Sequence, residues 1–411
     1  MKKRNYIFVF LSVFFPAISF CIRIIPVVKT SILGGQYFLE NESTSFGGNV
    51  NIFISPVVGF SEEHTLIPLF SFIYRGTKDV QELVGGGTLT QECLTLGPLG
   101  LKYVYKVSSS LKFKIKGTYK IEYLKETKDE EWQKGLFDYQ KTNFGSEIEA
   151  KFSDRFLVRI GLDYYTMRYP NYQSLVSKPE YKISIDTTTY TEISKNVGRN
   201  VLDYDSIDSF VEGSFSLTKN LLVQVLYNIS FKTFSEQHIV NIVGRFEDKL
   251  RVDTLHTLRL NSVFNFDRMT LSITDIVKFY DSNQNSYDVS FTKFTENSYD
   301  YIENILSPSI NVYLGTKRPY ICFSLWWDVG YKTYLTNLAR DEVGNYADQK
   351  LSQQMNLLGL SCTYPVEKLL KGFSVKLATS YNIVSSNMKY ERFYKYNYSC
   401  FNYFLGLTYE Y

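Results

Sequence analysis

Hydrophobic and polar residues alternate along most of the chain. Between residues 111 and 123, every odd position except Gly117 is apolar or aromatic, and every even position is Lys, Thr or Glu. A period of two is typical of a β-strand whose two faces meet different environments. The same alternation recurs at residues 156–164, 221–232, 320–332 and 373–377. A soluble sandwich explains one such strand, but a long series of them predicts a larger β-structure.

About sixteen such segments follow one another, and the connections between them are of two alternating kinds. The candidate strands are residues 24–38, 44–60, 65–76, 91–106, 111–125, 139–152, 156–168, 206–217, 221–234, 251–266, 269–280, 298–314, 319–334, 351–364, 372–385 and 397–411. Short connections carry turn residues, as in Asp154-Arg155, whereas residues 169–205 form the longest connection. Short turns at one rim and long loops at the other are typical of a transmembrane antiparallel β-barrel, so we expect an all-β fold of that kind.

Three segments fit this pattern poorly. Residues 24–38 contain Gly34-Gly35 and alternate weakly, and residues 351–364 are interrupted by Gln353-Gln354. Asp275 falls on the apolar face of its segment, which predicts a β-bulge or a shifted register there. A barrel of about fourteen strands, with the first segment inside the lumen, is therefore the alternative to sixteen.

The chain ends in the sequence Gly406-Leu407-Thr408-Tyr409-Glu410-Tyr411. A last strand that reads Gly, two residues, an apolar residue, one residue and a terminal aromatic is the assembly signal of bacterial outer-membrane β-barrels. This chain resembles that signal at Gly406, Tyr409 and Tyr411, although Phe404 stands where a polar residue is usual. The resemblance is to porin-like outer-membrane barrels as a broad class. It implies recognition by the barrel assembly machinery and contact with the lipid bilayer and lipopolysaccharide of the bacterial outer membrane.

The N-terminal residues have the order of a secretory signal. A basic start at residues 2–4 is followed by an apolar run over residues 6–15 and then by small residues. This order predicts a signal peptide over residues 1–21 with cleavage near Ser19. The apolar run is too short to cross a bilayer as a helix. Cys21 leaves a lipoprotein as the alternative.

The composition favours strands and argues against a nucleic-acid partner. The chain has 34 Tyr and 31 Phe, and aromatic residues favour strands over helices. Its mean hydropathy of −0.17 fits a transmembrane barrel, in which only every second strand residue faces lipid. The formal net charge is +3, and removal of residues 1–21 takes away three cations and no acid. The mature chain is therefore nearly neutral, whereas nucleic-acid binding requires a basic surface.

Groups that would carry catalysis or hold a cofactor are sparse. The three histidines are His64, His238 and His256, and their surroundings do not suggest a Ser-His-Asp arrangement. The five cysteines form no CxxC pair, which argues against a metal site. Gly85-Gly86-Gly87 is not placed between a strand and a helix, so it predicts only a flexible loop. We therefore expect no enzyme, no cofactor and no metal.

The inward faces of the candidate strands carry many charges. Basic residues of two adjacent strands are expected beside acidic residues of the next strands. The candidates for lining the lumen are Lys102, Lys112, Lys114, Lys116, Lys120, Glu147, Glu149, Arg159, Asp163, Asp208 and Glu212. Opposed charges across a constriction would select small polar or charged solutes. Alternatively, these charges pair between strands and only hold the wall.

A barrel of about sixteen strands is too wide to be filled by its own side chains. We therefore expect residues 22–411 to form an outer-membrane porin-like channel for passive diffusion of small polar or charged solutes, ions included. The alternative is a surface-exposed binding or adhesion protein that uses the barrel as an anchor for long loops. Loop 169–205 fits both functions, because it can fold into the pore or stand outside it. The sequence leaves the solute and the oligomeric state open.

Overall fold

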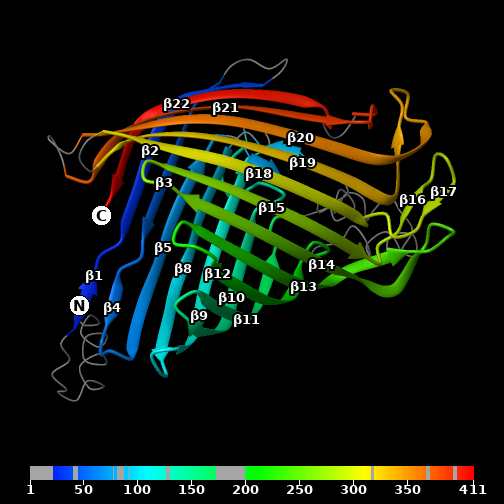
Figure 1. Cartoon of the computed structure of the whole chain (residues 1–411). Coiled ribbons are helices and arrows are strands. Elements are labelled where there is room, and N and C mark those ends of the chain that lie inside the picture. The colour runs from blue at the N-terminus through cyan, green and yellow to red at the C-terminus, as the bar shows by residue number, and fades with distance from the viewer. Residues whose placement is uncertain are drawn as a thin grey trace, which may run out of the picture.

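The structure of the protein, a computed structural model, describes residues 22–39, 45–76, 78–80, 88–90, 92–125, 130–172, 200–315, 319–366, 371–391 and 396–411. The predicted signal peptide, the Gly85-Gly86-Gly87 segment and most of loop 169–205 lie outside the described residues. Sixteen antiparallel strands close into one barrel, which confirms the predicted all-β fold (Figure 1). Among the described residues, no helix is long and apolar enough to cross a membrane.

The wall strands follow one another in chain order. They are β2 (Val28–Leu39), β3 (Ser45–Ile54), β5 (His64–Arg75), β8 (Glu92–Lys106), β9 (Leu111–Lys125), β10 (Tyr139–Ser153), β11 (Phe156–Arg168), β12 (Tyr204–Ser216), β13 (Leu221–Val240), β14 (Phe246–Asn265), β15 (Met269–Ser282), β18 (Tyr301–Leu314), β19 (Ile321–Arg340), β20 (Tyr346–Pro365), β21 (Phe373–Ser386) and β22 (Tyr398–Glu410). Each pairs with its neighbours along the chain, and β22 pairs with β2 to complete the circle.

In the part of the chain that the structure describes, six short strands accompany the wall. Near the first turn, β1 (Arg23–Ile25) pairs with β4 (Val57–Gly59). Two small hairpins, β6 (Lys78–Val80) with β7 (Thr88–Thr90) and β16 (Ser286–Asp288) with β17 (Lys293–Thr295), lie in long connections. The short turns and the two ends of the described chain share one rim, and the long connections share the other (Figure 1).

Apolar side chains cover the outside of the barrel. The alternating segment that predicts β9 exposes Phe113 and Ile115, while Lys114 on its other face is buried. β10 and β11 expose Ile148 and Ile160 in the same way. A continuous apolar belt is unfavourable in water and favourable in the hydrocarbon core of a membrane.

The two ends of the described chain close the barrel. Tyr411 and Val28 exchange backbone hydrogen bonds of 2.9 and 3.0 Å. A Cβ on Gly406 would lie 1.9 Å from the carbonyl oxygen of Ile32, so this close approach of β22 to β2 requires glycine. The first segment therefore belongs to the wall, and the fourteen-strand alternative is wrong.

Asp275 is accommodated without a bulge. β15 pairs with β14 and β18 in unbroken register, so this residue stays on the outer face. Its Oδ1 accepts a hydrogen bond of 2.7 Å from Nδ2 of Asn304 on β18. The predicted bulge or shift is wrong, because an amide of the neighbouring strand pairs with the carboxylate where it stands.

Two hairpins extend past the long-loop rim. Sequence predicts loops at 235–250 and 335–350, but β13–β14 and β19–β20 continue to turns at 241–245 and 341–345 (Figure 1). Oδ1 of Asn241 accepts backbone N–H bonds in the first turn, and Oδ1 of Asp341 does the same in the second. The loop predictions are wrong because a side chain at each turn satisfies the backbone and lets strand pairing continue.

Candidate functional site

Ion pairs cover the inner face of β8 to β12. Lys114 lies at the centre, with Nζ 2.6 Å from Glu147 Oε1 and 2.5 Å from Glu149 Oε2. Lys112 Nζ lies 2.7 Å from Glu149 Oε1, and Lys102 Nζ lies 3.6 Å from Glu147 Oε2. The register of β9 against β10 sets the contacts of the β9 lysines, because it places Lys112 directly opposite Glu149 and Lys114 directly opposite Glu147.

Gly145 leaves room for the next ion pair. Lys116 on β9 reaches across β10 to Asp163 on β11, with Nζ 2.8 Å from Oδ2. A Cβ on Gly145 would lie 1.7 Å from Asp163 Oδ1 and 2.7 Å from Lys116 Cε, so a larger residue would obstruct the pair. Arg159 on β11 pairs in turn with Glu212 on β12. We name this set the charge ladder: Lys102, Lys112, Lys114, Lys116, Glu147, Glu149, Arg159, Asp163 and Glu212.

The two remaining lumen candidates lie outside the charge ladder. Lys120 Nζ is 2.9 Å from Glu122 Oε2 and donates a hydrogen bond of 2.5 Å to the Tyr139 hydroxyl. Asp208 accepts a hydrogen bond of 2.8 Å from Ser206 Oγ. The registers place every one of the predicted candidates on the inner face of its strand. In the charge ladder, five cations face four anions, so its formal charge is +1.

The opposite arc of the inner wall carries fewer charges. Ser324 Oγ donates to Asn311 Oδ1 at 2.6 Å, and Ser380 Oγ donates to Asn402 Oδ1 at 3.1 Å. At the β2–β22 junction, four buried side chains form an apolar cluster, namely Leu33, Tyr37, Cys400 and Phe404. The lumen therefore has one arc rich in ion pairs and one arc lined mainly by hydroxyl, amide and apolar groups.

A closed hydrogen-bonded wall with an apolar outside and a polar inside satisfies every backbone group within lipid. A closed wall with these two faces is characteristic of the β-barrel proteins that cross the bacterial outer membrane. The chain is an outer-membrane β-barrel. The short-turn rim of such barrels faces the periplasm, and the long-loop rim faces outward.

Several solved outer-membrane proteins resemble the barrel in fold. OmpT of Vibrio cholerae, an outer membrane protein in trimer form, has a TM-score of 0.45 at 11% identity, covering 95% of this chain and 99% of that chain. OccAB4 of Acinetobacter baumannii has a TM-score of 0.45 at 9% identity, and the match covers 94% of this chain and 98% of that chain. OpdQ of Pseudomonas aeruginosa has a TM-score of 0.45 at 7% identity, and the match covers 94% of this chain and 98% of that chain. No protein-family model and no curated protein sequence matches the chain.

A short motif recurs where descending strands of the barrel begin at the outer rim. It consists of an apolar residue, Asp or Asn, and Tyr, and its copies are Phe137-Asp138-Tyr139, Leu202-Asp203-Tyr204, Tyr299-Asp300-Tyr301 and Tyr396-Asn397-Tyr398. The middle side chain accepts a backbone N–H bond from the end of the preceding ascending segment. The Oδ1 atoms accept from Leu124 at 2.8 Å, Tyr169 at 2.7 Å, Ser282 at 2.7 Å and Ser386 at 2.7 Å, in the same order. The motif therefore ties each pair of strands together where the loop leaves the wall.

Burial changes the acidity of the aspartates at the middle position of this motif. Desolvation raises the pKa of Asp138 to about 6 and that of Asp300 to about 6, although the accepted backbone bonds act in the opposite direction. Desolvation also raises the pKa of Asp203. The fourth copy carries Asn397, which makes the same contact without a charge.

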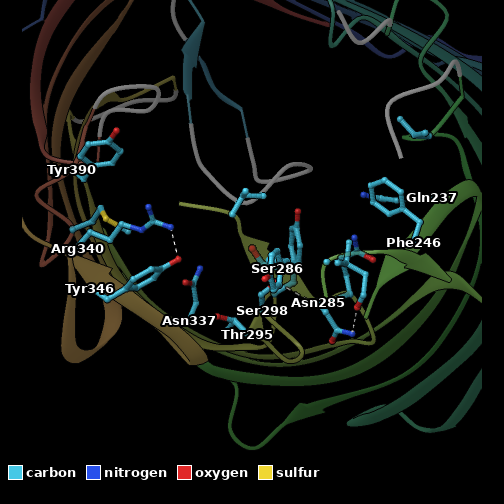
Figure 2. A pocket seen from close by; sticks show the side chains of 18 of the residues that line it. Gln237, Phe246, Asn285, Ser286, Thr295, Ser298, Asn337, Arg340, Tyr346 and Tyr390 are labelled. Atoms are coloured by element: carbon cyan, nitrogen blue, oxygen red, sulfur yellow. Dashed lines mark hydrogen bonds between the residues drawn. The ribbon is translucent and has the colours of Figure 1, made fainter. Parts of the chain in front are cut away.

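Above the barrel rim lies a cavity of about 670 Å³, which we call the vestibule. β13–β14 contributes Gln237 and Phe246 on one side, and β19–β20 contributes Arg340 and Tyr346 on the facing side (Figure 2). The connection between β15 and β18 also lines it, through Gln284, Asn285, Ser286, Tyr287, Val289, Thr295, Ser298 and Tyr299. Motif residues of the outer rim also line it, namely Leu202, Tyr299 and Tyr396.

The sequence predictions did not identify the vestibule or the rim motif. The feature of the sequence that indicates the rim motif most strongly is its spacing, because Asp203, Asp300 and Asn397 follow one another at intervals of 97 residues. The Nδ1 atoms of His64 and His256 contact the hydroxyls of Tyr103 and Tyr227, at 2.5 and 2.7 Å respectively. His238 Nδ1 contacts the carbonyl oxygen of Glu247 at 2.7 Å.

Proposed function

We propose that the barrel is a channel for passive diffusion of small polar or charged solutes across the outer membrane. The observation that supports this is the inner wall, where charged side chains remain partly accessible in the lumen. The side chain of Lys112 is 43% exposed and that of Lys116 is 33% exposed. Ions and polar solutes passing such a wall exchange hydration for contacts with lysine and carboxylate groups.

This function needs neither a cofactor nor a catalytic residue. Since each ladder carboxylate has a cation within reach, the pairs also stiffen the wall, and selectivity depends on the surplus charge. With a formal charge of +1 on the ladder, we expect weak preference for anions. Both interpretations of the lumen charges therefore apply, because pairing shapes the wall and the exposed members act on solutes.

The test is single-channel conductance of the refolded mature chain in a planar bilayer, with reversal potentials measured in a salt gradient. Lys116→Gln removes one exposed cation, and the expected result is a shift of a few millivolts towards cations, an order-of-magnitude value for one charge in a wide pore. The double variant Lys116→Asp with Asp163→Lys keeps the pair and the net charge, so it controls for the altered contact. Lys219→Glu changes charge in an exposed short turn and controls for charge outside the lumen.

A folded barrel that inserts but never conducts would contradict the channel. It would favour the second candidate, a surface-binding protein, for which the hairpins that extend past the outer rim are the supporting observation. In that case, replacing residues 176–196 by a short linker is expected to abolish binding to a surface ligand. In a channel, the same replacement is expected to leave or raise the conductance.

A further inference from the structure

The vestibule is lined by uncharged polar and aromatic groups together with several aliphatic ones. Its volume of about 670 Å³ falls within the 300–1,000 Å³ that is typical of small-molecule sites. Arg340 is the one charged side chain among the described residues that line it. Its Nη2 lies 2.6 Å from Asp288 Oδ2, so its charge is already compensated. The same atom also contacts the Tyr346 hydroxyl (Figure 2). A charged ligand would find no counter-ion there among these residues.

Among the described lining residues, Gln284 has a buried atom without a hydrogen-bond partner. Gln284 is 3% exposed, and its Nε2 donates to the carbonyl oxygen of His238 at 3.5 Å. This contact orients the amide, and Oε1 is buried without a hydrogen-bond partner. A buried acceptor left unpaired costs free energy, so the position favours a ligand that brings an O–H or N–H donor.

Aromatic rings are held in place in the wall of the same cavity. The Tyr287 ring rests on Gly244, where a Cβ would lie 2.6 Å from Cδ1, and the Tyr390 ring rests on Gly344, where a Cβ would lie 3.0 Å from Cε2. Both glycines occupy the left-handed region, with φ of 80° and 101°, in the turns of the two extended hairpins. The hairpin turns therefore support tyrosine rings that face a common cavity.

We propose that the vestibule binds a neutral saccharide. The face of an aromatic ring is negative, and the C–H faces of a sugar ring are apolar and weakly positive, so the two stack well. The hydroxyls of the sugar donate to Gln284 Oε1 and bond to amides such as Asn337. As an account of which solute the channel takes, this proposal rests on the proposed function, because a ligand held there sits at the outer mouth of the lumen.

The test is isothermal titration calorimetry of the refolded full-length mature chain in detergent with four probes: maltose, glucose, glucose 6-phosphate and adenosine. Binding of maltose or glucose, with glucose 6-phosphate at least about tenfold weaker, is expected, since burying the phosphate without a counter-ion is costly. Equal or tighter binding of glucose 6-phosphate or adenosine would overturn the saccharide class. No heat with either neutral sugar, from a barrel whose circular dichroism shows folded strands, would overturn the proposal.

Two variants locate the site. Gln284→Met removes the unpaired acceptor at similar volume and is expected to raise the Kd for maltose about tenfold, whereas Gln224→Met, an amide on the inner face of β13, is the matched control. Tyr390→Leu is the second variant, with Tyr381→Leu on the outer face as its control. Unchanged Kd in both Gln284→Met and Tyr390→Leu would overturn the assignment of the site.

The outcomes separate this proposal from the channel. Maltose binding by a barrel that never conducts would support the vestibule site and contradict the channel. Normal conductance without sugar binding would do the opposite. With both present, maltose in the outer chamber is expected to interrupt the current, and Gln284→Met is expected to shorten those interruptions about tenfold while the sugar-free conductance stays the same.

Discussion

The charge ladder and the vestibule treat polar groups in opposite ways. In the ladder, register places a cation near every carboxylate, and Lys114 alone contacts two of them. In the vestibule, charge is compensated at the edge by Arg340 and Asp288, and a neutral amide keeps an unpaired oxygen. Buried atoms without a partner occur in both regions, at Arg159 Nε and Asp163 Oδ1 in the ladder and at Gln284 Oε1 in the vestibule. The difference therefore lies in charge: the ladder holds its ions in pairs that stabilise the wall, whereas the vestibule offers a ligand mainly neutral groups.

The largest expected effect comes from breaking the centre of the ladder. Lys114→Met leaves Glu147 and Glu149 close together with only their outer partners, so we expect a loss of about 3 kcal/mol in the free energy of unfolding. Urea unfolding in lipid vesicles, followed by tryptophan fluorescence, measures this loss. Lys151→Met, whose partner is the exposed Asp154, is the control and is expected to leave the unfolding midpoint unchanged. Similar losses in the two variants would show that the ladder is no more important than a surface pair.

A smaller effect is expected at the glycine that lets the ladder cross β10. Gly145→Ala forces Lys116 and Asp163 apart and is expected to cost about 1–3 kcal/mol by the same unfolding assay. In an Asp163→Ala background the clash with Asp163 is gone and Lys116 is no longer held against Gly145 by the ion pair, so the cost of Gly145→Ala is expected to shrink. An unchanged cost in that background would contradict the steric explanation.

The rim motif predicts a pH effect of about 1 kcal/mol. Folding raises the pKa of Asp300 to about 6 from an ordinary value near 3.9, because burial disfavours the carboxylate. Its stabilising contribution is therefore complete below about pH 4 and is lost as the pH rises through about 6. As the pH falls from 7.5 to 5, the free energy of unfolding of the wild-type barrel is therefore expected to increase relative to that of Asp300→Asn.

Asn397 provides the natural precedent for that substitution, since it makes the same cap with an amide. Asp300→Asn should thus be neutral or stabilising at pH 7.5, whereas Asp300→Ala loses the bond to Ser282 and is expected to cost about 1 kcal/mol. Urea midpoints of the three proteins at both pH values test this. Identical pH dependence in the wild type and Asp300→Asn would remove Asp300 as the titrating group.

Much of the wall could be predicted from local pattern. The alternation over residues 111–123 predicts both the length of β9 and the face that meets lipid, because successive strand residues point to opposite sides. The predictions failed where a distant residue decides the outcome. Asp275 needs Asn304 from the next strand, and the extended hairpins need turn-capping side chains whose effect depends on pairing of the whole hairpin.

By itself, the sequence determined the all-β class and the lipid-facing side, and it indicated about sixteen strands with lysines and acids on the inner side. These follow from period and turn chemistry, which act over a few neighbouring residues. Only the tertiary structure decided which acid each lysine meets, that Gly145 opens a path to Asp163, and that hairpins 100 residues apart share one cavity. Register and barrel closure set those contacts, and both depend on the simultaneous pairing of all the strands.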